Sequence, residues 1–160
     1  MKPKSAAPKA QKQQKAAPAK DICPCGSGKD FAACCGPYLA GAQPTPTAQA
    51  LMRSRYTAFS RGDFEYVLRS WHSRTRPPSV DLSSAGSITW DRLEVVACRA
   101  GGKTAKEGKV EFIAHCTIAG RPEHLHEVSR FVREDGQWFY MDGEIKQARL
   151  DKGDTKPKKA

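Results

Sequence analysis

The sequence of 160 residues contains six cysteines, four of which fall within thirteen residues. Cys23 and Cys25 form one pair, and Cys34 and Cys35 form a second pair after a loop of eight residues. Four thiolates that converge from two such pairs can bind Zn²⁺ tetrahedrally, with Zn–S bonds of ~2.3 Å. Because four protein ligands leave no position for water, the pattern predicts one zinc ion with a structural rather than a catalytic role.

Other chemistries use the same residue types. Iron can occupy a cage of thiolates, and two of the cysteines could form a vicinal disulfide or a redox pair. A disulfide or a redox pair does not explain why four cysteines are clustered. The residues between the pairs suit a metal site, since Gly26 and Gly28 allow positive φ and a sharp turn. We expect backbone N–H groups of this turn to donate to the thiolates and the ring of Phe31 to cap the site.

The net charge of +10 comes mainly from the two ends of the chain. Residues 1–20 carry six lysines and no acidic residue, and residues 151–160 carry four lysines and two aspartates. Residues 21–150 carry 17 basic and 15 acidic side chains, so this part is nearly neutral. The composition predicts a disordered basic tail over 1–20 and a flexible basic tail over 147–160. Such tails could contact nucleic acid or a ribonucleoprotein through counterion release.

The sequence lacks the signals of an exported or membrane-spanning protein. No apolar run approaches the roughly 18 residues that a transmembrane helix needs, and the first residues contain no apolar signal-peptide core. We therefore expect a cytoplasmic protein. Its thiols would be kept reduced, which again favours a metal site over disulfides.

Two helices are expected after the cysteine module. Thr47 is a suitable N-cap for the first helix, and Gly62 ends it. Asp63 can cap the second helix, which cannot continue through Pro77-Pro78. The faces expected to be buried recur at helical spacing: Ala48, Leu51, Met52, Arg55, Tyr56 and Phe59 in the first helix, and Phe64, Val67, Leu68 and Trp71 in the second.

From Ile88 onward the hydrophobic pattern changes to a period of two, which is typical of β-strands. Four strands are expected, over residues 88–97, 110–118, 124–133 and 137–142. Glycine-containing turns between them, above all the Asp-Gly pair before the last strand, indicate an antiparallel meander. Two helices followed by such strands predict an α+β fold. Residues 21–42 would form the small cysteine module and residues 46–146 the larger domain.

Several segments resemble known families. The segment CPCGSGK at 23–29, followed by Cys34-Cys35, resembles the SEC-C motif. Three later segments resemble the bacterial YchJ family: residues 51–72, which begin with LMRSRY and end with WH, SRF at 129–131, and GQWFYMDG at 136–143. The resemblance implies an N-terminal SEC-C zinc module and a middle domain of the nuclear transport factor 2-like (NTF2-like) type. In that fold, helices pack on a curved antiparallel sheet and form a cone, but the resemblance implies no reaction.

The cone fold has a mouth between the sheet and the helices, where some members of the superfamily hold their sites. The candidates to line this pocket are Tyr56, Trp71, His72, Glu127 and Ser129. A buried Glu127 near His72 could act as an acid or base. Alternatively, Arg53 or Arg55 neutralises Glu127 within a satisfied polar core, since buried charges need partners.

Other residues that could do chemistry have a simpler interpretation. Cys98 and Cys116 stand in or beside apolar strand positions, so both are expected to be small buried side chains. His124 and His126 are two residues apart on one strand and could form half of a metal site, although a solvated edge of the sheet is the default interpretation. The three tryptophans are expected in the core: Trp71, Trp90 and Trp138.

The leading functional hypothesis is a zinc-binding, non-catalytic adaptor. The module and the basic tails would contact a protein or a ribonucleoprotein, because a closed Cys₄ site offers no catalytic position. The alternative is a small-molecule binding protein or enzyme that uses the pocket of the cone domain.

Overall fold

The computed structural model describes residues 20–81 and 85–148. Its elements are η1 (Phe31–Ala33), α1 (Gly36–Leu39), α2 (Ala48–Arg61), α3 (Phe64–Arg69), η2 (Ala85–Ser87), β1 (Ile88–Ala100), β2 (Glu107–Ile118), β3 (Arg121–Glu134) and β4 (Gln137–Ala148). The predicted basic tails lie outside the described residues, apart from Lys20 and the last two residues of β4. No helix within the described ranges is long and apolar enough to cross a membrane.

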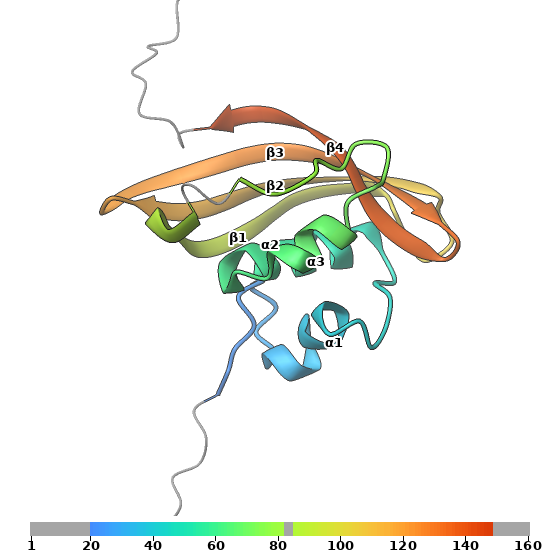
Figure 1. Ribbon diagram of the computed structural model, residues 1–160, viewed down its shortest axis with the longest axis horizontal. Coiled ribbons are helices and arrows are strands. Elements are labelled where there is room, and N and C mark those ends of the chain that lie inside the picture. Colours follow the sequence, from blue (N-terminus) through green and yellow to red (C-terminus); the bar gives the residue numbers. More distant parts are fainter. Residues whose placement is uncertain (1–19, 82–84, 149–160) are drawn as a thin grey trace, which may run out of the picture.

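The four strands form one antiparallel sheet in the order β1-β2-β3-β4. The sheet curves over α2 and α3, and the cysteine module with η1 and α1 lies on the other side of these helices (Figure 1). This arrangement confirms the predicted α+β class, with helices packed on a curved antiparallel sheet and a small N-terminal module.

Helix α2 begins and ends at the residues predicted for it. The hydroxyl oxygen of Thr47 accepts a hydrogen bond from the backbone N–H of Ala50 at 3.1 Å, as an N-cap does. Gly62 ends the helix with φ of +75°, a left-handed conformation that glycine adopts without steric cost. The carboxylate of Asp63 then accepts from the backbone N–H of Tyr66 at 3.0 Å and caps α3.

Helix α3 is shorter than its apolar spacing predicts, because the chain leaves the helix to pair with β4. The backbone N–H of Tyr140 donates to the carbonyl of Ser70 at 2.8 Å, and that of His72 donates to the carbonyl of Tyr140 at 2.7 Å. Trp71 forms a parallel bridge with Tyr140. The assignment of Trp71 to the helical face is therefore wrong, since strand pairing directs its side chain.

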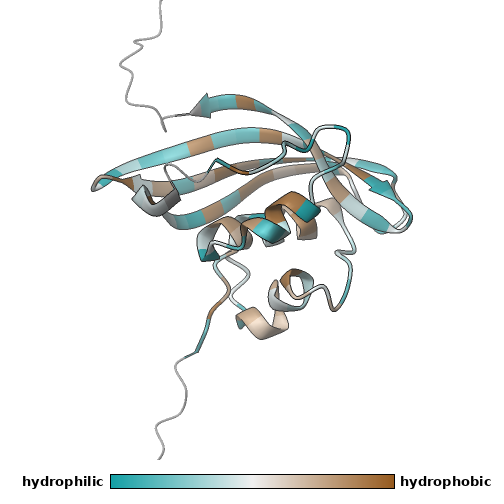
Figure 2. Ribbon diagram, viewed as in Figure 1, coloured by the Kyte–Doolittle hydropathy of each residue, from teal (hydrophilic) through white to brown (hydrophobic). Residues whose placement is uncertain are grey.

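Strand β2 follows the predicted alternation, and Figure 2 shows hydrophobic and hydrophilic residues alternating along the strands. Its buried residues include Val110, Phe112, Ala114 and Cys116. Burial of Cys116 is thus confirmed, but Cys98 is exposed and the prediction for it is wrong. Cys98 pairs with buried Val110, yet it lies near the end of β1, an edge strand with no neighbouring strand on its outer side.

Interruptions of the strand pairing bend the sheet. The register shifts lie between Trp90 and Arg92, between Val95 and Ala97, between His126 and Glu127, and between Arg130 and Phe131. Such bulges bend a strand and increase its twist, so the sheet presents a concave face to α2. Strands β3 and β4 also extend further than predicted, since the former starts at Arg121 and the latter reaches Ala148.

One continuous group of buried residues joins the cysteine module, the helices and the sheet. Three of the four clustered cysteines belong to this group. Among the tryptophans expected in the core, Trp138 is buried, and its Nε1 donates to the carbonyl of Pro46 at 3.3 Å. Trp71 and Trp90 are only partly buried, because each has one side on a cavity.

The turn between β1 and β2 packs against the start of β2 and the first residue of α2, and leaves no room for a side chain at Gly108. A Cβ on Gly108 would lie 2.5 Å from Cα of Gly101 and 3.1 Å from Cβ of Ala48. Gly108→Ala should lower the free energy of unfolding, measured with urea, by about 1–3 kcal/mol, as overpacking does. Gly102→Ala in the same turn is the control, since a Cβ there meets no atom within 4 Å. Equal losses in both variants would contradict this explanation.

Candidate metal centre and cone cavity

The fold brings the Sγ atoms of all four clustered cysteines within 4.8 Å of one another. The Sγ atom of Cys34 lies 3.5 Å from that of Cys25 and 4.0 Å from that of Cys35. These separations are too long for a disulfide, whose sulfur atoms lie ~2.05 Å apart. They fit a tetrahedral site, because Zn–S bonds of ~2.3 Å place the sulfur atoms about 3.8 Å apart. The four residues can therefore hold a metal ion.

Hydroxyl groups surround the sulfur atoms. Ser27 Oγ lies 3.1 Å from the Sγ atom of Cys34, and Thr57 Oγ1 lies 3.6 Å from that of Cys23. Hydrogen bonds of this kind orient metal-binding thiolates and stabilise their charge. The turn that carries Ser27 has the positive φ values predicted for it, +83° at Gly26 on one side and +78° at the glycine on the other.

The hydrogen bonds of the cluster concentrate negative charge on Cys25. The bond from Cys35 is the main reason that the pKa of Cys25 falls to about 4, and bonds from the backbone and hydroxyl of Ser27 add to it, while burial opposes the shift. The same bond to Cys25, followed by burial, raises the pKa of Cys35. Burial also raises the pKa of Cys34. A metal ion bound by these cysteines would displace the protons that remain on their thiols.

One face of α2 holds the module in place. The Arg53 side chain donates to the carbonyl of Cys25 at 2.6 Å. Two turns further along, Arg61 forms an ion pair with Asp21 at 3.1 Å, and its guanidinium carbon lies 3.8 Å from the ring centroid of Phe31. With Thr57 between them, these α2 residues are spaced by four and share one side of the helix.

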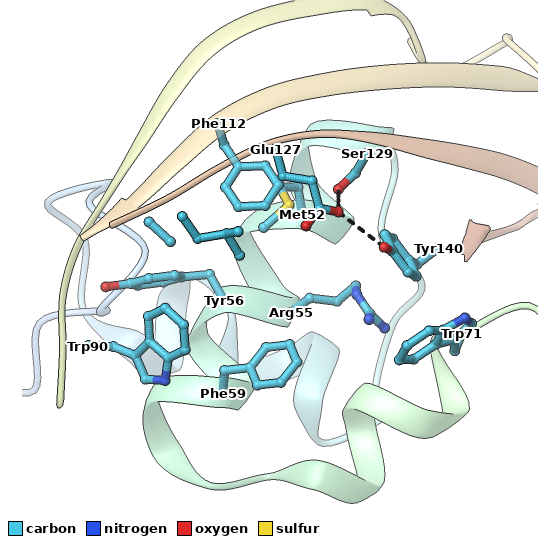
Figure 3. Close-up of a pocket in the computed structure, with 12 residues that line it drawn as sticks. Met52, Arg55, Tyr56, Phe59, Trp71, Trp90, Phe112, Glu127, Ser129 and Tyr140 are labelled. Carbon is cyan, nitrogen blue, oxygen red and sulfur yellow. Dashed lines mark hydrogen bonds between the residues drawn. The ribbon is translucent and has the colours of Figure 1, made fainter. Parts of the chain in front are cut away.

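The opposite face of α2 and the concave side of the sheet enclose a cavity of about 270 Å³. Figure 3 shows its walls in detail. It is lined by Met52, Arg55, Tyr56, Phe59, Trp71, Trp90, Phe112, Ala114, Leu125, Glu127, Ser129 and Tyr140. Four of the five residues expected to line a pocket therefore meet in one cavity.

The fifth expected residue, His72, does not line this cavity. Its ring is 4% exposed and packs against Phe139, and its Nε2 lies 2.9 Å from Oε1 of Glu134. Its Nδ1 accepts from the backbone N–H of Arg74 at 3.1 Å, which leaves Nε2 as the donor to the carboxylate. The expectation that His72 and Glu127 form an acid–base pair in the cavity is therefore wrong.

Strand-like alternation explains where His72 lies. Trp71 and Tyr140 form a bridge, and their rings contact each other on the cavity side with centroids 5.1 Å apart. Successive side chains in extended chain point to opposite faces. The next residue along one segment, His72, and the preceding one along the other, Phe139, therefore meet on the far side.

A buried arginine forms one end of the cavity. Arg55 is 4% exposed, and its Nη1 donates to the carbonyl of Val67 and to Oγ of Ser70, both at 2.7 Å. Its guanidinium carbon lies 4.5 Å from the ring centroid of Tyr140 and 5.3 Å from that of Trp71. Burial lowers the pKa of Arg55 to about 10, so the side chain keeps its positive charge at neutral pH.

The carboxylate of Glu127 lies at the same end of the cavity (Figure 3). Its Oε1 accepts from the hydroxyl groups of Ser129 at 2.9 Å and Tyr140 at 3.1 Å. Within the described part of the chain, this carboxylate is paired with hydroxyls and not with an arginine, since Arg53 bonds the cysteine module. Its charge still raises the pKa of Arg55. The expected direct pairing of Glu127 with Arg53 or Arg55 is therefore not present among the described residues.

Arg55 was expected only as an alternative partner of Glu127 and not as a wall of the pocket, and Tyr140 was not expected there at all. A signal for Arg55 was present, because an arginine within the buried face of a helix needs a polar partner or a cavity. Tyr140 had no such signal, since an aromatic residue in a strand most often belongs to the core.

Tyr56 presents a buried hydroxyl at the other end of the cavity. The residue is 3% exposed, and no described residue forms a hydrogen bond with its hydroxyl. Burial raises its pKa. In Figure 3 the hydroxyl points away from Arg55, toward the side of Trp90.

The predicted histidine half-site has no third ligand among residues 20–81 and 85–148, where the four cysteines form the one group found that could hold a metal. His126 Nε2 lies 2.8 Å from Oε1 of Glu111. His124 lies beside His115, with ring centroids 6.4 Å apart. These contacts are those of a polar sheet surface.

Comparison with known proteins identifies the family. The model described as "YchJ, middle NTF2-like domain" matches residues 47–143, more than half of the chain. The chain belongs to the YchJ family. A SEC-C motif is matched at residues 20–37, which contain all four clustered cysteines.

Relatives within the YchJ family share most of their length with this chain. A UPF0225 protein of Chromobacterium violaceum is 51% identical over 137 residues, which cover 84% of this chain and 97% of that protein. A UPF0225 protein of Methylibium petroleiphilum is 47% identical over 123 residues, 77% of this chain and 88% of that protein.

Two solved structures have the same fold. The solution structure of a SEC-C motif containing protein from Rhodopseudomonas palustris matches with a TM-score of 0.69 and 34% identity, over 76% of this chain and 96% of that one. The crystal structure of a SEC-C motif containing protein from Psychrobacter arcticus matches with a TM-score of 0.64 and 24% identity, over 81% of this chain and 84% of that one.

The unpartnered hydroxyl of Tyr56 makes a testable difference to stability. Tyr56→Phe should leave the free energy of unfolding unchanged or raise it by about 1 kcal/mol, because burying an unpaired hydroxyl is costly. Tyr66→Phe is the matched comparison, since the Tyr66 hydroxyl lies 2.6 Å from Oγ of Ser54, and its loss should lower stability by about 1 kcal/mol. Urea denaturation measures both, and a larger loss for Tyr56→Phe would contradict the assignment.

Proposed function

We propose that this protein is a zinc-stabilised binding protein. The four cysteines hold one structural zinc ion, and the cone domain binds a small molecule without transforming it. The observation that carries the second part is the cavity of about 270 Å³, which combines aromatic walls with a buried Arg55 at one end.

The donor set supports zinc as the metal. Four sulfur ligands within 4.8 Å of one another suit the tetrahedral preference of zinc. Three of these residues are buried and the fourth, Cys34, is partly exposed, so all four ligand positions are filled by protein. When bound, the ion would cross-link the two ends of the loop that separates the cysteine pairs. Its role is then to hold the module together, as in other structural zinc sites.

Metal analysis tests this role. The purified wild-type protein should contain one equivalent of zinc by plasma mass spectrometry, and Cys34→Ser should contain almost none. The variant should also melt at a lower temperature, because the metal contributes to folding. Cys98→Ser is the control, since Cys98 is exposed and lies outside the cluster. Folded wild-type protein without metal, or with iron in place of zinc, would contradict the proposal.

The distribution of polar groups supports binding rather than catalysis. Known binding pockets are mainly apolar, with a few polar groups that orient the ligand. Here the polar groups of Arg55, Glu127, Ser129 and Tyr140 gather at one end. The rest of the lining is apolar or aromatic, apart from the Tyr56 hydroxyl at the other end. A general acid–base reaction needs a titratable pair within reach of the substrate, and His72 lies outside the cavity.

Blocking the cavity tests the binding role. Small aromatic probes such as indole and quinoline should show saturation-transfer NMR signals with the wild-type protein. Ala114→Leu should abolish these signals, because Ala114 is 2% exposed and lines the cavity. Ala97→Leu on the exposed part of β1 is the matched control and should keep them. Absence of binding by all aromatic probes, or binding that Ala114→Leu does not reduce, would contradict the proposal.

The adaptor role expected from the sequence stays a prediction. Its support is the cysteine module itself, whose surface includes the apolar side chain of Ile22 at 49% exposure. The basic tails that would assist it lie outside the described residues. A role in contacting a protein or ribonucleoprotein is compatible with ligand binding, because the module and the cavity use opposite faces of α2.

A further inference from the structure

We propose that the ligand of the cone cavity is a neutral, planar molecule of one or two rings that carries a hydrogen-bond acceptor next to a donor, as a carboxamide or a lactam does. This inference rests on the proposed small-molecule role and adds the chemical class of the ligand. It follows from the hydrogen-bonding capacity that remains at the polar end of the cavity and from the charge balance there.

The hydrogen-bond donors without a protein acceptor at the polar end of the cavity belong to Arg55. Its Nη1 is already bonded to the carbonyl of Val67 and the hydroxyl of Ser70. No described residue accepts from its Nε or Nη2, although a guanidinium carries five N–H groups. These nitrogens are not fully shut off from solvent, since among the described residues only the Tyr56 hydroxyl is a fully buried side-chain polar atom without a partner. A ligand acceptor at this end, such as a carbonyl oxygen, would replace water at Arg55.

The hydrogen-bond acceptor without a protein donor at this end of the cavity belongs to Glu127. Its Oε1 receives the hydroxyl groups of Ser129 and Tyr140. No described residue donates to its Oε2. The two hydroxyls fix the plane of the carboxylate, so Oε2 is held ready for a donor on the ligand, such as an amide N–H. Figure 3 shows the Glu127 carboxylate and the Arg55 guanidinium on neighbouring walls of the same end of the cavity.

The opposite charges of Arg55 and Glu127 lie at the same end of the cavity, where Arg55 is buried and Glu127 is partly exposed. A carboxylate ligand would satisfy Arg55 but meet the negative charge of Glu127, and an ammonium ligand would meet the positive charge of Arg55. Either would leave one charge at this end without compensation, which is costly where the ligand displaces water. A neutral ligand with an acceptor and a donor satisfies both side chains and leaves the balance intact.

The remaining walls set the shape and size of the ligand. Trp71 and Tyr140 meet edge to face beside Arg55, and Tyr56 meets Trp90 edge to face further along. Flat rings pack well against such aromatic walls. The volume of about 270 Å³ lies just below the range of ~300–1,000 Å³ typical of drug-sized ligands, so one or two rings are expected.

Matched probes of different charge test this inference. Benzamide, benzoate and benzylamine carry a neutral, a negative and a positive group on the same benzene ring. Naphthamide, naphthoate and naphthylmethylamine do the same on naphthalene. Titration of the full-length, metal-loaded protein by NMR should show the amide of each set binding at least about tenfold more tightly than its charged partners, a difference of about 1.4 kcal/mol. A carboxylate or amine that binds as tightly as its amide would overturn the inference and leave the proposed function intact. Absence of binding by every probe, including indole, would contradict the proposed function itself.

Glu127→Gln tests the charge argument directly. The amide oxygen of glutamine can still accept from Ser129 and Tyr140, but the cavity gains a net positive charge. Preference should then move toward benzoate by about tenfold or more. Glu111→Gln is the matched control, because Glu111 precedes the cavity-lining Phe112 in β2 and faces the other side of the sheet, beside His126. If folded Glu127→Gln ranks the amide, carboxylate and amine probes as the wild-type protein does, the inference is overturned. If that variant does not fold, the ranking of the probes by the wild-type protein alone decides the inference.

Discussion

Helix α2 has to satisfy two sites at once, and the arrangement of the whole molecule depends on it. On one side, Arg53, Thr57 and Arg61 contact the cysteine module. On the other side, Met52 and Tyr56 line the cavity. A helix of 3.6 residues per turn separates these two sets by about a third of a turn, so neither can be moved without moving the other. Caps at both ends fix where α2 begins and stops, and thereby fix both sites.

A charged group can be buried inside the cone only because the surrounding polar groups stabilise it. Arg55 is held by two acceptors from α3 and its C-terminal turn and lies over the ring of Tyr140. The Tyr140 hydroxyl in turn donates to Glu127, whose carboxylate collides with any Cβ placed at Gly143. This sequence of contacts links α2, α3, β3 and β4. The polar end of the cavity is therefore rigid, which is a requirement for selective binding.

Local chemistry explains what could be predicted from the sequence. Thr47 and Gly62 act on the backbone beside them, so the bounds of α2 were predictable, and the spacing of the cysteines alone indicated a cluster. His72 and Cys98 depended on distant partners. His72 points away from the cavity because β4 pairs with the chain at Trp71, and Cys98 is exposed because β1 is an edge strand. No periodicity in the sequence records which segment pairs with which, and these two predictions failed for that reason.

The cysteine module is too small to have a hydrophobic core of its own, since domains below ~40 residues usually need metals or cross-links. Two kinds of interaction replace that core. Its buried cysteines join the main core of the protein, and α2 supplies the ion pair of Arg61 with Asp21 and the bond of Arg53 to the module backbone. An exposed ion pair contributes only about 0–1 kcal/mol, so these contacts orient the module more than they stabilise it. Most of the stability of the module must then come from burial of the cysteines, and a metal ion held by the four thiols would add to it.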